Sequence, residues 1–172
     1  MLDFPATVEA KNIETLLWKK CFHSHIEAYR QDIKKLAVVL DTKYNDRGNS
    51  AGHVAQSFAQ YKSEENLLQL TSSLERFLAQ ALAFYQELIC EFEKRRSNSV
   101  GDDAYSRRQI YFCLLYLGDV ARYAEIHSVS SKQKDWSVPE RYYTRALQTM
   151  PGSGNPYNQV SNSEREKILF CP

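Results

Sequence analysis

The sequence predicts an all-α protein, an antiparallel array of helices, and two observations support this fold class. Apolar residues recur at steps of three and four along most of the 172-residue chain, which is the spacing of one helix face. Alternating strand patterns bounded by turn residues are scarce, and the counts of Gly 6 and Pro 5 are low. We therefore expect long helices joined by short polar turns.

Composition and charge argue against two classes of partner. The net charge of +1 and the pI near 7.7 give no basic field of the kind that binds nucleic acid, so we expect no direct RNA or DNA binding. No apolar run approaches the roughly 20 residues that cross a bilayer, and the N-terminus has no basic start followed by an apolar core. We expect no signal peptide, no membrane anchor and no membrane partner.

The cysteines are scattered along the chain without the spacing of a metal site. Cys21, Cys90, Cys113 and Cys171 form neither a CxxC motif nor a Cys/His ligand pattern. We expect a reduced, intracellular protein that has neither a metal nor a cofactor.

The first long helix is expected from about Asn12 to Leu40. Its apolar stripe consists of Trp18, Phe22, Ile26, Tyr29, Ile33 and Leu36. A polar line beside that stripe consists of Lys19, His23, Arg30 and Lys34, at steps of four, seven and four. These basic residues form either a solvated helix edge or one wall of an anion-binding groove.

The next segment lacks sustained periodicity. Residues 41 to 61 carry Gly, Asn, Asp and Ser, which predicts a loop with His53 exposed in it. A second long helix is expected to begin at Ser63, with acidic residues in its first turn, and to end near Lys94. Residues 93 to 103 then form a turn, with basic residues at the end of the helix.

The third helix, expected from about Asp102 to His127, contains the string LYLGDVARY. Gly118 interrupts it, which indicates a neighbour packed closely against that turn, because glycine costs about 1 kcal/mol against alanine in a helix interior. The string ends on Arg122 and Tyr123. Spacing alone leaves Arg122 two interpretations: a local ion pair with Asp119, three residues earlier, or a ligand for an anion.

Two further helix starts are expected near the end of the chain. Ser137 and Glu140 form an S-x-x-E capping box, with a proline between them, so a fourth helix should run from there to Met150. In the turn PGSGNPYNQV that follows, Asn155 is placed to cap a fifth helix and Pro156 is at the first position of that helix.

Three strings together resemble the SMG family of nonsense-mediated mRNA decay factors, relatives of the telomerase-associated "ever shorter telomeres" protein. They are LLWKKCFHSHIEAYR at 16–30, LYLGDVARY at 115–123 and ERYYTRALQTMPGSGNPYNQ at 140–159. The string FYQELI at 84–89 and the lengthened loop before ERYY resemble the adaptor member of the SMG heterodimer. The hairpin string alone would indicate only a tetratricopeptide-like repeat.

The resemblance implies a partial 14-3-3-like, tetratricopeptide-like helical domain over residues 11–160, followed by a non-family C-terminal tail over residues 161–172. Family members have further helices before the LLW string and after PYNQ, so we expect a truncated array. In that family the domain recognises phosphoserine or phosphothreonine on the RNA helicase of the decay pathway.

The resemblance also implies a phosphate pocket. Arg122 and Tyr123 match its arginine and tyrosine, and Arg30 falls where 14-3-3 proteins place a second arginine. A phosphate of nearly two negative charges favours planar guanidinium groups and a hydroxyl donor such as that of Tyr123. Asp119 would then hold the guanidinium of Arg122 in place.

The lysine of the family's pocket is replaced in this chain. His23 stands at the lysine position, and Lys19 or Lys20, one turn earlier, could substitute for it. If His23 is a ligand, the affinity for phosphate should rise as the pH falls through the pKa of His23, near 6.5 when unperturbed.

The implied function is that of a non-catalytic phosphopeptide-binding adaptor in mRNA decay. No nucleophile, base and orienter set and no cluster of aspartates for a metal is visible, so we expect no enzyme. The implied partners are the phosphorylated helicase peptide, a second SMG protein and a recruited protein phosphatase, in the cytoplasm with shuttling to the nucleus. The alternative is a helical-repeat scaffold, or a telomerase-associated factor, with a degenerate phosphate pocket.

Overall fold

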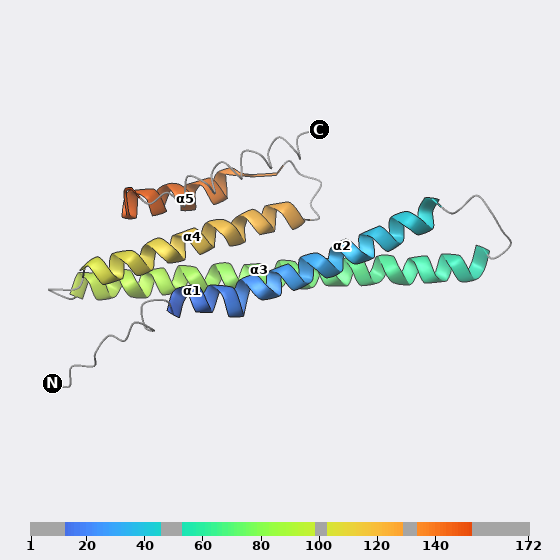
Figure 1. Ribbon diagram of the computed structural model, residues 1–172, viewed down its shortest axis with the longest axis horizontal. Helices are drawn as coiled ribbons and strands as arrows, with labels where there is room; N and C mark the ends of the chain where they lie inside the picture. Colours follow the sequence, from blue (N-terminus) through green and yellow to red (C-terminus); the bar gives the residue numbers. More distant parts are fainter. Residues whose placement is uncertain (1–12, 46–52, 99–102, 129–133, 153–172) are drawn as a thin grey trace.

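The computed structural model describes residues 13–45, 53–98, 103–128 and 134–152, and all regular elements in these ranges are helical (Figure 1). In chain order they are α1 (Ile13–Leu17), the π-helix η2 (Trp18–His23), α2 (Ser24–Asn45), α3 (His53–Asn98), α4 (Asp103–His127) and α5 (Ser137–Thr149). The all-α fold class is therefore confirmed. The fifth helix expected at Asn155 and the tail at 161–172 lie outside the described residues.

The helices form an antiparallel array along α3. α2 and α4 each pack on α3, and α5 packs on α4 (Figure 1). Successive long helices run in opposite directions, and the end of α2 projects with the start of α3 beyond α4 and α5 (Figure 1). None of the helices in the described ranges is both long and apolar enough to cross a bilayer.

α4 forms the centre of the core. It lies between α3 and α5 and also contacts α1, so apolar residues are buried around most of its circumference. Its least exposed apolar side chains, each at most 3% exposed, are those of Ile110, Cys113, Leu114, Leu117 and Val120. This buried stretch leads directly into Arg122 and Tyr123.

The first helix differs from the expectation in its winding. The expected helix from about Asn12 to Leu40 is interrupted by the π-helical segment η2, where the N–H of Ser24 bonds to the carbonyl of Lys19, five residues earlier. A π turn is wider than an α turn, so Lys19 leaves the α-helical line that the sequence spacing predicted with His23. The apolar stripe persists, with Ile26 fully buried.

An aromatic cluster fixes this irregular segment to the core. The rings of Trp18 in η2 and Tyr116 in α4 stack with centroids 4.8 Å apart and planes 10° apart. Tyr85 of α3 packs edge-on against Trp18, at 6.2 Å between the centroids. Such aromatic pairs contribute about 0.5–1.5 kcal/mol each beyond their buried area. The cluster thereby positions the start of α2, on which Arg30 lies.

The loop predicted over residues 41–61 is wrong at both of its ends. α2 continues to Asn45, and α3 begins at His53 rather than at Ser63, so His53 is a helical residue. The segment HVAQSFAQYK that begins α3 is polar, but it contains neither Gly nor Pro and includes the helix-favouring residues Ala and Gln. Helix propensity therefore prevails over polarity there.

The capping box predicted at the start of α5 is also wrong. Ser137 is the first residue of α5 rather than its cap, and the residue before it, Trp136, makes no side-chain cap. The carboxylate Oδ1 of Asp135 instead accepts the N–H of Ser137 at 3.0 Å, and the hydrogen bonds from Ser137 lower the pKa of Asp135. An aspartate readily binds the backbone two residues further on, and its charge makes it the stronger acceptor.

Candidate functional site

Two arginines from different helices meet on one tyrosine ring. The Cζ atom of Arg122 lies 4.6 Å from the ring centroid of Tyr123, and the Cζ atom of Arg30 lies 5.0 Å from the same centroid. Both distances are within the range of a cation–π contact. Arg30 belongs to α2 and the other two residues to α4, so the structure brings together three of the six predicted phosphate ligands. We call these three residues the paired-arginine site.

The paired-arginine site is open on the side of Arg30. The side chain of Arg30 is 35% exposed, whereas that of Arg122 is 11% exposed and Tyr123 is buried. Burial raises the pKa of Tyr123, and the neighbouring charge of Arg122 opposes that shift. The hydroxyl therefore keeps its proton at neutral pH and has the chemistry of a hydrogen-bond donor.

Each arginine has a carboxylate beside it on its own helix. Nη1 of Arg30 contacts Oε1 of Glu27 at 2.5 Å, and Nη2 of Arg122 lies 3.8 Å from Oδ1 of Asp119. The local pair that the spacing of Asp119 and Arg122 predicted is therefore present. Exposed pairs three residues apart contribute only about 0.2–0.5 kcal/mol in isolated helices, so a bidentate anion can compete with the partly exposed pair of Arg30 and Glu27.

Tyr143 of α5 contacts two neighbouring residues of α4, Gly118 and Asp119. Its hydroxyl donates to Oδ1 of Asp119 at 2.9 Å, the same oxygen that faces Arg122. Its ring covers Gly118, where a Cβ would lie 2.2 Å from the ring atom Cε1. This confirms the close neighbour that Gly118 predicted. α5 thus helps to orient the Asp119 carboxylate and, through it, the guanidinium of Arg122.

The remaining predicted ligands lie outside the paired-arginine site. Nε2 of His23 is 3.9 Å from Oε1 of Glu27, and its side chain is 42% exposed. Lys19 and Lys20 are exposed on η2, and in the described part of the chain no ion pair or ring contact joins either lysine to that site. His23 and Arg30 share Glu27 as a partner. The roles of His23, Lys19 and Lys20 as phosphate ligands stay predictions.

The sequence reasoning missed His127, the last residue of α4. Its ring nitrogen Nε2 is buried and makes no hydrogen bond within the described residues. Burial lowers its pKa, as do the charges of Arg30 and Lys134, while Glu27 acts in the opposite sense. The one available signal was its spacing of four residues from Tyr123, which places both side chains on one helix face.

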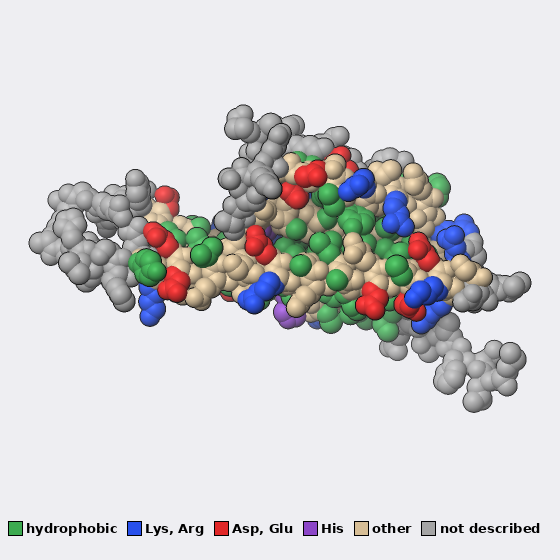
Figure 2. Space-filling view, turned by 180° about the vertical axis from the view of Figure 1, so that it is seen from behind, with side chains coloured by type: hydrophobic (Ala, Val, Ile, Leu, Met, Phe, Trp, Pro, Cys, Tyr) green, Lys and Arg blue, Asp and Glu red, His purple; other side chains and the backbone are tan. Residues whose placement is uncertain are grey.

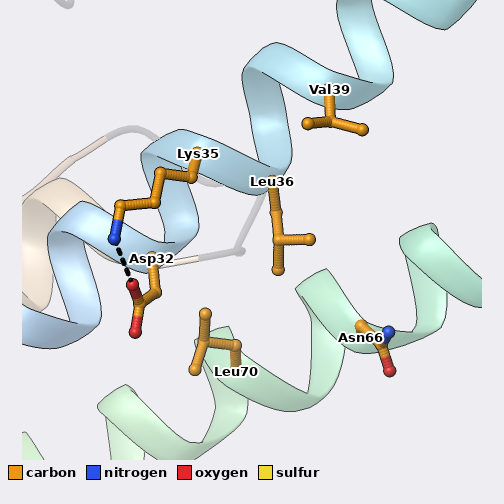
Figure 3. A pocket seen from close by; sticks show the side chains of 6 residues that line it. All are labelled: Asp32, Lys35, Leu36, Val39, Asn66 and Leu70. Carbon is orange, nitrogen blue, oxygen red and sulfur yellow. Dashed lines mark hydrogen bonds and ion pairs between the residues drawn. The ribbon is translucent and has the colours of Figure 1, made fainter.

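A separate open groove lies between α2 and α3. It has a volume of about 500 Å³ and is lined by the side chains that Figure 3 labels, namely Asp32, Lys35, Leu36, Val39, Asn66 and Leu70. Its cation is already paired, because Nζ of Lys35 donates to Oδ1 of Asp32 at 2.9 Å (Figure 3). The lining is mainly apolar, so this groove is a poorer phosphate site than the paired-arginine site.

The charge on the surface is mixed in sign. Figure 2 shows the face opposite to that of Figure 1, where acidic and basic side chains are interspersed with apolar ones. This face does not present the continuous basic surface that nucleic-acid binding requires. Among the described residues there is also no cluster of three His, Cys, Asp or Glu side chains that could hold a metal ion.

Fold and site together define an antiparallel helical array that carries a paired-arginine site suited to an anion. Residues 12–109 match the family described as Telomerase activating protein Est1, which is more than half of the chain. The chain belongs to this Est1 family, in agreement with its resemblance to the SMG decay factors. No solved structure matches the chain.

Individual relatives agree with this family. The chain is 25% identical to the nonsense-mediated mRNA decay factor SMG7 of Arabidopsis thaliana, over 89% of this chain and 15% of that protein. It is 25% identical to the decay factor SMG5 of Mus musculus, over 94% of this chain and 16% of that protein. It is 24% identical to the telomerase-binding protein EST1A of Danio rerio, over 89% of this chain and 9% of that protein.

Proposed function

We propose that this chain is a non-catalytic adaptor of nonsense-mediated mRNA decay that binds a phosphoserine or phosphothreonine peptide of the pathway's RNA helicase. The convergence of Arg30 and Arg122 on Tyr123 carries this proposal. The relatives named as mRNA decay factors support the pathway. As further partners we propose a second SMG protein and a protein phosphatase, and as the location the cytoplasm.

The charges of the paired-arginine site suit a phosphoryl group. Such a group carries about 1.5 to 2 negative charges at pH 7 and three acceptor oxygens. Guanidinium groups from two helices can each offer two parallel N–H donors, and the protonated hydroxyl of Tyr123 adds a neutral donor. An unmodified serine hydroxyl offers neither the charge nor the oxygens, so the site should discriminate between the two forms of a peptide.

The carboxylates next to the arginines balance their charge in the empty site. Without an anion, the charges of Arg30 and Arg122 are compensated by Glu27 and Asp119. The pair of Arg30 with Glu27 is about one-third exposed on both side chains, so solvent screens it and its contribution to stability is small. A phosphate can displace Glu27 at little expense while Asp119 continues to orient Arg122.

The test compares a phosphorylated helicase peptide with its unphosphorylated twin by fluorescence anisotropy. The wild-type chain should bind the phosphorylated form more tightly, and Arg122→Glu should remove most of that preference. A charged hydrogen bond contributes about 1.5–3 kcal/mol, which corresponds to roughly a 10- to 150-fold loss. Equal affinity for the two peptides, or unchanged binding by Arg122→Glu, would contradict the proposal.

The matched control is another arginine of α4. Cζ of Arg108 lies 5.6 Å from the ring centroid of Phe112, so this residue has a similar cation–π geometry on the same helix. Arg108 is exposed and lies outside the paired-arginine site. Arg108→Glu should therefore keep the preference for the phosphorylated peptide, apart from a small long-range electrostatic effect.

A helical-repeat scaffold is the second candidate function. The apolar groove between α2 and α3, which Val39 lines, and the exposed side chains of Val38 on α2 and Leu68 on α3 favour a protein partner that binds through apolar contacts. Under this alternative Arg122→Glu would retain its partners in a pull-down, whereas Val39→Asp would lose them. The two variants therefore distinguish the two functions.

A further inference from the structure

His127 lies one helical turn beyond Tyr123 of the paired-arginine site and has no role in the function proposed above. It ends α4, four residues after Tyr123, and therefore shares that helix face with the tyrosine. Its Nε2 atom is buried and makes no hydrogen bond within the described residues. A buried imidazole nitrogen without a partner is uncommon, because leaving such a group unsatisfied costs about 1–3 kcal/mol.

Charged residues of two other segments act on His127. The charges of Arg30 and Lys134 disfavour its protonated form and that of Glu27 favours it; Arg30 and Glu27 belong to α2, and Lys134 to the segment that precedes α5. Lys134 is tethered there, because its Nζ donates to the carbonyl of Ser128 at 2.8 Å. A histidine at a helix C-terminus would ordinarily favour the charged form. Burial and the two cations outweigh that preference, so the pKa of His127 is lowered and the ring is neutral at pH 7.

A bound phosphoryl group would reverse this balance. Its negative charge would lie next to Arg30, and would cancel the repulsion that disfavours the imidazolium form of His127. It would also offer acceptor oxygens to Nε2 once the ring turns towards the site, because that atom is buried and without a partner in the empty site. The neutral ring would then take up one proton from solvent, and the imidazolium would donate it as a hydrogen bond to a phosphate oxygen.

We propose that His127 is a further phosphate ligand that takes up a proton when the phosphoryl group binds, which makes the affinity of the paired-arginine site depend on pH. This inference rests on the proposed function of that site. It assigns to His127 the pH-sensing role that the sequence suggested for His23, whose side chain is 42% exposed and lies 3.9 Å from Glu27.

The test is calorimetry with the phosphoserine peptide at pH 7.0, in two buffers that differ in ionisation enthalpy. The difference in binding enthalpy gives the number of protons taken up. The phosphoryl group, with a pKa near 6, can release only about a tenth of a proton at this pH. The wild-type chain should show a net uptake of about 0.2 proton or more, because the protonated fraction of His127 rises from less than about a quarter to more than half when its pKa rises past 7 on binding.

Two variants separate the candidate histidines. His127→Gln should abolish proton uptake and weaken the phosphopeptide affinity about tenfold, since it removes a charged donor. His23→Gln should keep the uptake of the wild-type chain. Retained uptake in His127→Gln would overturn the role of His127, as would absent uptake in a wild-type chain that still prefers the phosphorylated peptide.

A measurement on the wild-type chain covers the case in which His127→Gln fails to fold. The ring signals of His127 in a ¹H–¹⁵N NMR titration should give a pKa below 6.5 in the free chain and above 7 with the phosphoserine peptide bound. An unchanged pKa would overturn the inference. Equal affinity for the peptide and its unphosphorylated twin would overturn the proposed function and this inference together, so the two failures are distinguishable.

Discussion

The ring of Tyr143 occupies the space that a side chain at position 118 would need. An ideal Cβ on Gly118 would lie 2.2 Å from Cε1 of Tyr143, and Tyr143 itself is fully buried. The ring therefore cannot move aside without shifting α5 relative to α4. Because the hydroxyl of the same tyrosine donates to Asp119, this close packing also sets the position of the carboxylate that faces Arg122.

We predict that Gly118→Ala destabilises the chain. Alanine improves helix propensity by about 1 kcal/mol, but overpacking a filled core costs about 1–3 kcal/mol, so the net loss should be up to about 2 kcal/mol. Urea unfolding measures this difference. In a Tyr143→Leu background, where the ring is gone, the same substitution should become neutral or stabilising; a loss of the same size in both backgrounds would show that Tyr143 is not the obstacle.

A second prediction concerns the hydroxyl of Tyr143. Tyr143→Phe keeps the ring but removes the hydrogen bond to Asp119, so the free energy of unfolding should fall by about 1–2 kcal/mol. The preference for the phosphorylated peptide should fall as well, because the guanidinium of Arg122 is less well oriented. Tyr142→Phe is the control: its hydroxyl accepts an exposed bond from Gln86, and its loss should change stability by less than about 0.5 kcal/mol.

The cysteines should differ in reactivity. Cys113 is buried in α4, and burial raises the pKa of its thiol to about 12, with a further contribution from Glu14. Cys21 and Cys90 are exposed. Iodoacetamide at pH 8 should therefore label Cys21 and Cys90 in the folded chain and Cys113 only after unfolding, as read by mass spectrometry. Labelling of Cys113 at a rate equal to that of Cys90 would contradict the packing of α4.

The same thiol should contribute to alkaline instability. Its pKa is raised on folding, so the neutral thiol is favoured by the folded state and the thiolate by the unfolded state. The contribution of Cys113 is therefore fully present below the pKa of an unfolded cysteine, near 8.5, and declines as the pH rises from there towards 12. Cys113→Ser has no thiol at this position, so its Tm should fall less between pH 8 and pH 10 than the Tm of the wild-type chain.

A fifth prediction separates Arg30 from the lysines of η2. Arg30→Gln should remove most of the preference for the phosphorylated peptide, because Arg30 contacts the Tyr123 ring. Lys19→Gln and Lys20→Gln should each change that affinity by less than about threefold, since these exposed side chains act only through a screened field. Titration at two salt concentrations measures both effects. If Lys19→Gln lost as much affinity for the phosphorylated peptide as Arg30→Gln, this would indicate that Lys19 takes the place of the family's pocket lysine.

The sequence predicted the helices best where packing and periodicity agree. α4 was expected over residues 102–127 and spans Asp103–His127, because its apolar residues recur regularly and turn residues flank it. The start of α3 was placed ten residues late, since a polar helix that extends past its core contacts has no apolar period to mark it. The π turn at Trp18–His23 has no sequence signal of this kind.

The candidate site could be predicted only in part for a related reason. Arg122 and Tyr123 are neighbours in sequence, so their proximity is local, whereas the approach of Arg30 depends on how α2 and α4 pack on α3. The family resemblance supplied that long-range pairing. His127 was missed because its spacing from Tyr123 does not reveal which charges another helix brings to it.

The central claim is that Arg30 and Arg122 bind one phosphoryl group together. NMR of the arginine Nε–Hε groups tests this directly, with signals assigned from Arg→Lys variants. On titration with the phosphoserine peptide, the signals of Arg30 and Arg122 should move with a single Kd while that of Arg108 stays in place, and the unphosphorylated twin should move none of them. Peptide binding that leaves both signals unmoved, or equal shifts with the twin, would contradict the account.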